Sequence, residues 1–125
     1  MSSLLPDQPL VHLDPESALA QIGDMESLVG MLSMLEETLS RDIPAIEELL
    51  AAQDVVGANR LLHPLKGFLP IFCRPALCEH VTLVEVLSKD ASCTSVGPAY
   101  AELKPELLLL LSEVSAYLNQ GPTGA

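Results

Sequence analysis

The chain has 125 residues, a length that suits one domain with a real hydrophobic core and is too short for two ordinary domains. Seventeen acidic residues against six Lys plus Arg give a net charge of −11, which argues against binding to a nucleic-acid backbone or an anionic membrane surface. Hydrophobic residues make up 49% of the chain and aromatic residues only 3%, so aliphatic side chains must fill the core, as in helices packed on helices.

The cysteines, the longest apolar run and the N-terminus indicate the cellular compartment of the protein. Cys73, Cys78 and Cys93 are an odd number without framework spacing, which is typical of free thiols in a reducing environment. The longest leucine run, residues 107–111, is far shorter than the roughly 20 residues that a membrane-spanning helix needs. The N-terminus has neither a basic flank nor a long apolar core, so no signal peptide is indicated. We therefore expect a cytoplasmic protein without membrane insertion.

The chain begins with a segment that shows no periodicity. Residues 1–13 contain two prolines, and we expect them to form a flexible or loosely docked arm. Asp14 followed by Pro15 is typical of a helix start, with the acid as N-cap and the proline at the first helical position. This short first helix should end at Gly23.

A long second helix should follow, capped by Asp24. Pro44 interrupts its hydrogen-bond ladder and should kink the helix without ending it, because the apolar period resumes directly afterwards. The apolar positions keep a spacing of three and four over more than six turns: Leu28, Met31, Leu32, Leu35, Leu39, Ile43, Ile46, Leu49 and Leu50.

The third helix should run over residues 55–72, after a turn in which Asp54 is the N-cap. Pro64, Gly67 and Pro70 lie inside it, and each is costly in a helix interior. A break at Pro64 is one interpretation. The apolar positions keep their phase through Pro64, however, which favours a kinked but continuous helix. These positions are Val55, Ala58, Leu62, Leu65, Leu69 and Phe72.

Two more helices complete the chain. The fourth begins at Arg74 and Pro75, with Leu77, Val81, Val84 and either Leu87 or Ser88 on its inner face. Residues 88–97 are small and polar, which indicates a loop. Pro98 can open the last helix, and Pro105 either kinks this helix or is its true first residue. Its inner positions are Leu103, Leu107, Leu110, Val114 and Tyr117.

Four amphipathic helices with short connections predict an all-α fold. We expect an antiparallel, up-down-up-down four-helix bundle, with the short first helix as an additional N-terminal element. The domain should cover residues 14–119, after the flexible arm at 1–13 and before a flexible tail at 120–125.

One histidine stands out against this scaffold. At about 100° per residue, His63 points roughly 130° away from the middle of the apolar stripe of its helix. Residues 55–78 contain no Asp or Glu, yet they carry half of the basic residues of the chain: Arg60, Lys66 and Arg74. This local excess of cations predicts a site that tolerates an anion.

The neighbours of His63 suit phosphoryl chemistry. A neutral imidazole is nucleophilic and can accept a phosphoryl group on nitrogen. Lys66, one helical turn away, can balance the roughly two negative charges of that group. Gly67 removes a side chain where a partner's active site would come close. From the spacing alone, an exposed histidine beside an ordinary lysine is an equally good interpretation.

Other chemistry has weaker support. Cys73, Cys78 and His80 do not have a structural zinc spacing, so we predict no metal site. His12 and His80 are expected to be ordinary surface or boundary histidines. A metal-dependent helical-bundle enzyme is a distant alternative, because the chain has no Glu-x-x-His pair.

The segment His63-Pro64-Leu65-Lys66-Gly67 is similar to the His-x-Leu-Lys-Gly signature of histidine-containing phosphotransfer (HPt) domains of bacterial multistep phosphorelays. The resemblance extends over about residues 14–118. Further resemblances are the helix break at Gln21-Ile22-Gly23-Asp24, the patch Asp42-Ile43-Pro44, the cap at Asp54, and Leu83-Val84-Glu85, which looks like the family's Leu-x-Glu.

The resemblance implies a phosphorelay intermediate that takes a phosphoryl group from a receiver-domain aspartate and passes it to another receiver. It implies His63 as phosphoacceptor, Lys66 as phosphoryl-stabilising cation and Gly67 as the clearance residue. The receiver would supply magnesium, so the chain needs no cofactor of its own. The partners would be response-regulator receiver domains and a hybrid sensor histidine kinase, and the chain would act as a monomer. It would be either free-standing or the C-terminal domain of such a kinase.

The chain also departs from the family pattern. Phe68, Leu69 and Pro70 stand where small residues usually follow the glycine, and Cys73 replaces a later glycine. An alternative function is therefore a non-catalytic adaptor or inhibitor that binds a receiver or a histidine kinase without phosphotransfer. In both cases we expect the following residues to contact the partner: Asn59, Arg60, Pro64, Phe68, Pro70 and Arg74.

Overall fold

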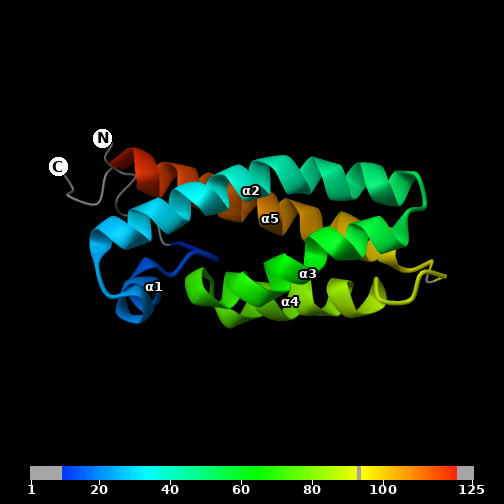
Figure 1. Cartoon of the computed structure of the whole chain (residues 1–125), viewed down its shortest axis with the longest axis horizontal. Coiled ribbons are helices and arrows are strands. Elements are labelled where there is room, and N and C mark those ends of the chain that lie inside the picture. Colours follow the sequence, from blue (N-terminus) through cyan, green and yellow to red (C-terminus); the bar gives the residue numbers. More distant parts are fainter. Residues whose placement is uncertain (1–9, 93, 121–125) are drawn as a thin grey trace.

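The computed structural model describes residues 10–92 and 94–120. These residues form five helices, which confirms the all-α class (Figure 1). The helices are α1 (Pro15–Ile22), α2 (Met25–Ala51), α3 (Val55–Phe72), α4 (Pro75–Leu87) and α5 (Val96–Gln120). In this part of the chain the one β-type pairing is an isolated bridge between Leu13 and Cys73. Most of the expected arm, the thiol of Cys93 and residues 121–125 of the expected tail lie outside the described residues.

Local hydrogen bonds explain where the first three helices begin. The carboxylates of Asp14, Asp24 and Asp54 each accept a hydrogen bond from the backbone N–H three residues later, at 3.2, 2.8 and 2.9 Å. Such N-caps satisfy amide groups that have no partner inside the helix. The end of α1 is equally local, because Gly23 has a φ of 106°, a conformation that favours glycine. The predicted starts of these helices are confirmed.

The helices pack along their lengths (Figure 1). α2 contacts α3 and α5, and α4 contacts the same two helices. The short α1 lies at one end, against α2 and α3. Among the described helices, none combines sufficient length with sufficient apolar character to cross a membrane.

The predicted apolar stripes form the core. Those of α2, α3 and α5 are buried almost throughout, and the hydroxyl of Tyr100 ties α5 to the carbonyl oxygen of Ile43 at 2.8 Å. Met31 was expected on the inner face of α2, but its side chain is exposed. α2 and α3 continue through Pro44, Pro64 and Pro70, so the break considered at Pro64 does not occur.

The last helix starts earlier than the sequence predicted. α5 begins at Val96, so the alternative in which Pro105 opens the helix is wrong, and Pro98 lies in the first turn. Val96 is completely buried, and the carbonyl oxygen of Ser95 accepts the first helical hydrogen bond from the backbone N–H of Ala99 at 3.0 Å. A proline is tolerated there because a first-turn residue needs no backbone N–H. The helix also includes Gln120, which was assigned to the tail.

The last residues of the expected arm are docked. A buried carboxylate on α5, that of Glu113, accepts hydrogen bonds from the backbone N–H groups of Val11, His12 and Leu13 at 2.6, 3.0 and 2.9 Å. Leu13 is completely buried, and His12, which was expected near the surface, is also buried. Of the two alternatives for the arm, flexible or loosely docked, residues 11–13 follow the docked one, because a distant carboxylate provides acceptors for their amide groups.

Candidate functional site

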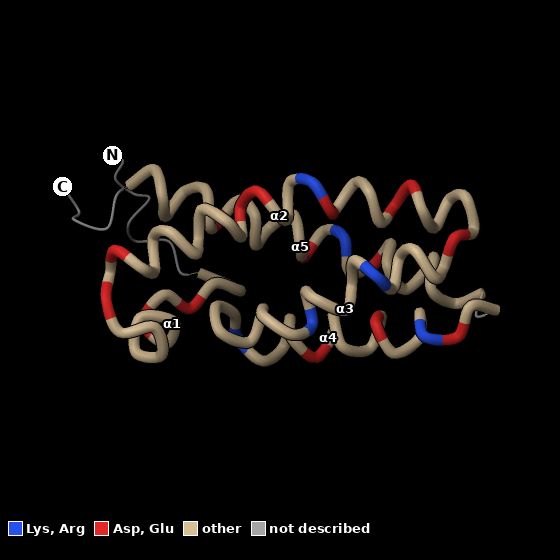
Figure 2. The backbone as a smooth tube through the Cα atoms, in the orientation of Figure 1, with Lys and Arg blue, Asp and Glu red and all other residues tan. Residues whose placement is uncertain are grey.

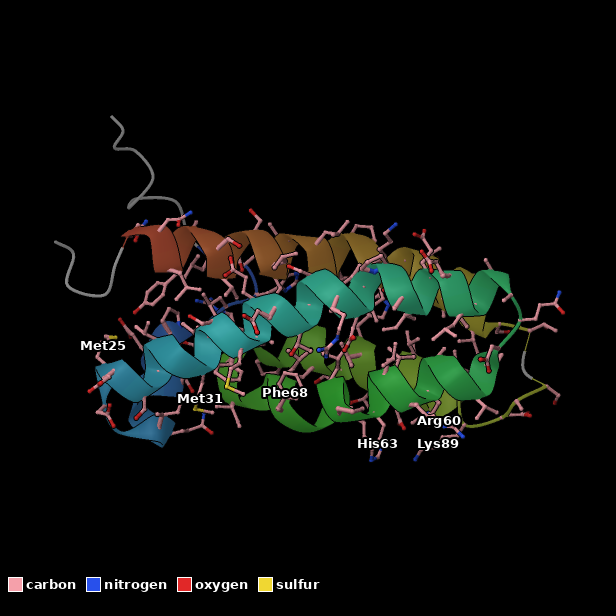
Figure 3. The ribbon with its side chains drawn as sticks, turned by 45° about the horizontal axis from the view of Figure 1, so that its top comes forward. Met25, Met31, Arg60, His63, Phe68 and Lys89 are labelled. Carbon is pink, nitrogen blue, oxygen red and sulfur yellow. The ribbon has the colours of Figure 1, made fainter. Side chains whose placement is uncertain are left out.

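α3 presents His63 to solvent. The apolar stripe of the helix faces the core, and the His63 side chain is 65% exposed on the other side. Arg60, His63 and Lys89 point away from the helices on the same side of the molecule (Figure 3). α3 carries Lys and Arg but no acidic residue along its length, in contrast to α2 (Figure 2). The exposure of the histidine and the local excess of cations thus coincide in space.

A buried carboxylate on α4 holds the imidazole. The Nδ1 atom of His63 lies 3.1 Å from Oε2 of Glu85, a side chain with no exposed surface. An ionised carboxylate can only accept a hydrogen bond, so Nδ1 carries the hydrogen and donates it. This contact fixes the tautomer and leaves Nε2 with its lone pair free.

Two lysines flank the same carboxylate. The ammonium nitrogen of Lys66 lies 3.1 Å from Oε1 of Glu85, and that of Lys89 lies 3.8 Å from the same oxygen. Oε1 of Glu85 has no hydrogen-bond partner among the described residues. Both lysine contacts are therefore ion pairs without well-directed hydrogen bonds. The lysine predicted to serve His63 is thus one of a pair that shares Glu85.

Asn59 completes the surroundings of Glu85. Its amide nitrogen lies 2.9 Å from Oγ of Ser88 and 3.2 Å from Oε2 of Glu85. The Ser88 hydroxyl donates in turn to the Glu85 carbonyl oxygen at 2.7 Å. Asn59, which we expected to contact a partner, therefore bridges α3 and α4 within the protein.

The surroundings of Glu85 favour its ionised form. Burial raises the pKa of this carboxyl, but the side chains of His63, Lys66 and Asn59 stabilise the carboxylate and outweigh burial. The net result is a pKa below the usual value for glutamate. The hydrogen-bond acceptor for His63 is therefore a charged group near neutral pH.

The other predicted site residues are spread over α3 and the residue before α4. Gly67 is exposed, and a Cβ atom built on it would meet no heavy atom within 4 Å. Pro70 is exposed on α3, about two turns after His63. Arg74 precedes α4 and lies beyond the end of α3 at Phe72, which is itself about 13 Å along the helix axis from His63 at a rise of about 1.5 Å per residue. Arg60 and Pro64 are exposed directly beside His63.

Phe68 belongs to a separate feature. It is half-buried, and with Phe72 and a row of α2 side chains it lines a surface pocket of about 240 Å³. The α2 residues of this pocket are Met31, Met34, Leu35 and Thr38. Figure 3 places Phe68 and Met31 away from His63, toward the end of the molecule that carries α1. The apolar pocket and the charged site therefore occupy different parts of α3.

Sequence reasoning missed the roles of Glu85 and Lys89. Glu85 lies four residues after Val81 and eight after Leu77, so it occupies the apolar face of α4. An acidic residue in such a stripe needs cationic or hydrogen-bonding partners, and this signal was readable from the sequence. Lys89 follows Glu85 by four residues, the spacing of a helical ion pair.

The cysteine and histidine groups weighed as metal ligands lie apart from this site. In residues 10–92 and 94–120, no group of three or more His, Cys, Asp or Glu side chains is arranged to hold a metal ion. His80 is bound instead to Glu106, with 2.7 Å between Nδ1 and Oε2. Burial raises the pKa of the Cys73 and Cys78 thiols, which keeps both in the unreactive protonated form.

The chain was compared with protein-family models, with curated proteins and with solved structures, and none of the three comparisons found a match.

Proposed function

We propose that this protein is a phosphorelay intermediate of the HPt type, in which His63 accepts a phosphoryl group from a receiver-domain aspartate and transfers it to another receiver domain. The observation that carries this proposal is the contact between Nδ1 of His63 and the buried carboxylate of Glu85, which leaves Nε2 as an exposed nucleophile. An exposed side chain and a fixed tautomer are two features that a nucleophilic histidine needs.

The proposed transfer requires little from this chain. The lone pair of Nε2 attacks the phosphorus of the receiver's aspartyl phosphate, the P–O bond to aspartate breaks, and its electron pair returns to the carboxylate. The imidazole keeps its hydrogen on Nδ1 and becomes cationic. Glu85 stabilises that positive charge through the existing contact. Transfer to the next receiver reverses these bond changes.

Lys66 and Gly67 fit the same proposal. Lys66 places an ammonium group on the same carboxylate that holds the imidazole, and it can stabilise the transferred phosphoryl group. Gly67 leaves open space where the receiver's active site must approach Nε2. The receiver would supply magnesium, and the chain would need no cofactor of its own.

The wider biological setting is part of this proposal. We propose that α2 to α5 form the antiparallel, up-down-up-down four-helix bundle of an HPt domain, with α1 as the additional N-terminal helix. The protein would act as a monomer in the cytoplasm, between a hybrid sensor histidine kinase and response-regulator receivers. It would have no nucleic-acid partner and no membrane insertion.

A second candidate is a non-catalytic adaptor or inhibitor that binds a receiver or a histidine kinase. The apolar pocket between α2 and α3 favours it, because exposed apolar surface is typical of binding sites. Met34, one of the lining residues, has 66% of its surface exposed. This candidate predicts binding without phosphate on His63.

Incubation with phosphorylated receivers separates the two candidates. The relay predicts acid-labile, base-stable phosphate on the wild-type protein and none on a His63→Gln variant. His80→Gln is a matched control, because His80 also pairs with a glutamate, Glu106, but is less exposed. Labelling of His63→Gln at the wild-type level would refute the relay, and stable binding without labelling would support the adaptor.

A further inference from the structure

Two lysines compete for one oxygen of Glu85. Lys66 reaches Oε1 from α3 at 3.1 Å, and Lys89 reaches it from the residues after α4 at 3.8 Å. Neither ammonium group has another acidic partner among the described residues. One carboxylate therefore faces two ammonium groups, and the site keeps one uncompensated positive charge.

The surrounding charges leave this excess unchanged. Arg60 is exposed and points to the same side as His63 and Lys89 (Figure 3). Asp90, which follows Lys89, is engaged by the backbone N–H and hydroxyl of Ser92 at 3.0 and 2.7 Å. Arg60 adds one positive charge and the ionised Asp90 removes one, so an excess of one positive charge faces the roughly two negative charges of a phosphoryl group.

The two lysines differ in how freely they can move. The Lys66 side chain is only 28% exposed and makes the shorter contact with the fully buried Glu85. If Lys66 moved away, the buried Glu85 carboxylate would lose the nearer of its two cations. A buried charge that is less well compensated costs free energy. The Lys89 side chain is 56% exposed and makes the longer contact. It can turn toward an anion on His63 at little cost.

We propose that Lys89 is a second phosphoryl-binding residue of this site, and that it moves from Glu85 to the phosphoryl group while Lys66 stays with Glu85. This inference rests on the proposed function of His63. It changes the role expected for Lys66, which becomes mainly the residue that keeps Glu85 ionised and in place. Lys89 then supplies the mobile cation.

A small phosphoramidate donor tests this without a receiver. The P–N bond of the donor breaks as the bond from Nε2 of His63 to phosphorus forms, and the leaving ammonia takes a proton from water. The rate of His63 labelling should fall about fivefold in Lys89→Gln, the effect of losing one partly exposed ion pair. Lys89→Arg should restore the rate. Lys104→Gln, which removes a lysine paired with exposed Glu47, should leave it unchanged.

NMR of the lysine ammonium groups reports the movement itself. On phosphorylation of the wild-type protein, the Nζ signal of Lys89 should shift, while those of Lys66 and Lys104 should change little. A shift of Lys66 with an unchanged Lys89 would overturn the inference, as would wild-type labelling of Lys89→Gln. If neither the wild-type protein nor any variant carries phosphate on His63, the proposed function is wrong, and the role proposed for Lys89 is wrong as well.

Discussion

The Nδ1 atom of His63 and the Oε2 atom of Glu85 lie 3.1 Å apart, although 22 positions separate the two residues in the chain. One side chain is largely exposed and the other is completely buried. The pair thus connects the solvent-facing side of α3 to the interior of α4. The packing of these two helices sets the orientation and the tautomer of the imidazole.

Removal of the Glu85 charge should allow the His63 ring to populate both tautomers. We expect the wild-type ring to carry its hydrogen on Nδ1, whereas in Glu85→Gln both tautomers should be populated, because an amide can donate as well as accept. Nitrogen-15 NMR of the His63 ring measures this ratio. In the matched variant Glu106→Gln, the His63 signals should not change, since Glu106 pairs with His80. An unchanged His63 tautomer in Glu85→Gln would contradict the role assigned to Glu85.

A side chain at position 67 should affect docking but not folding. Because a Cβ on Gly67 meets nothing within 4 Å, Gly67→Ala should raise the free energy of unfolding by about 0.5–1 kcal/mol through helix propensity. Phosphotransfer from a receiver should nevertheless become slower, while labelling by a small phosphoramidate stays at the wild-type rate. Gly30→Ala, at another open helical position, should gain stability and keep both rates. Equal losses with the receiver and with the small donor would contradict a clearance role.

Acid should remove a stability contribution that depends on Glu85. The pKa of Glu85 in the folded protein lies below its usual 4.5, so on acidification the unfolded chain binds the proton first. The contribution is therefore complete above about pH 4.5 and is lost as the pH falls through the folded-state pKa. Urea unfolding at pH 7 and pH 3 should show a smaller acid loss for Glu85→Gln than for the wild type. Glu79→Gln, an exposed position on the same helix, should keep the wild-type loss.

The sequence predicted those parts of the structure that depend on neighbours in the chain. Asp14, Asp24 and Asp54 cap helices through amides three residues away, so their role is readable locally. The exposure of His63 follows from helical periodicity. The start of α5 at Val96 was missed because Pro98 suggested a later start, although Ser95, a residue type that is common at N-caps, directly precedes the helix. The partners of Glu85 on α3 were missed because they lie on another helix, although an acid in the apolar stripe of α4 already indicated that it needs partners.

The docking of residues 11–13 is a second long-range contact with a measurable consequence. Glu113→Ala removes the acceptor of three backbone N–H groups and should lower the free energy of unfolding by about 2–4 kcal/mol. The amides of Val11, His12 and Leu13 should then exchange with solvent much faster. Glu102→Ala, at an exposed position of the same helix, should change stability by less than about 0.5 kcal/mol. Unchanged exchange at residues 11–13 would show that Glu113 does not hold this segment.

The most direct test of the central claim is to locate the phosphoryl group on the imidazole. Phosphorus-31 and nitrogen-15 NMR of the phosphorylated protein identify which ring nitrogen of His63 is bonded to phosphorus. Because Glu85 engages Nδ1, the phosphoryl group should be on Nε2, with the Nδ1 hydrogen retained. A phosphoryl group on Nδ1, or a protein that carries none on His63, would contradict the account.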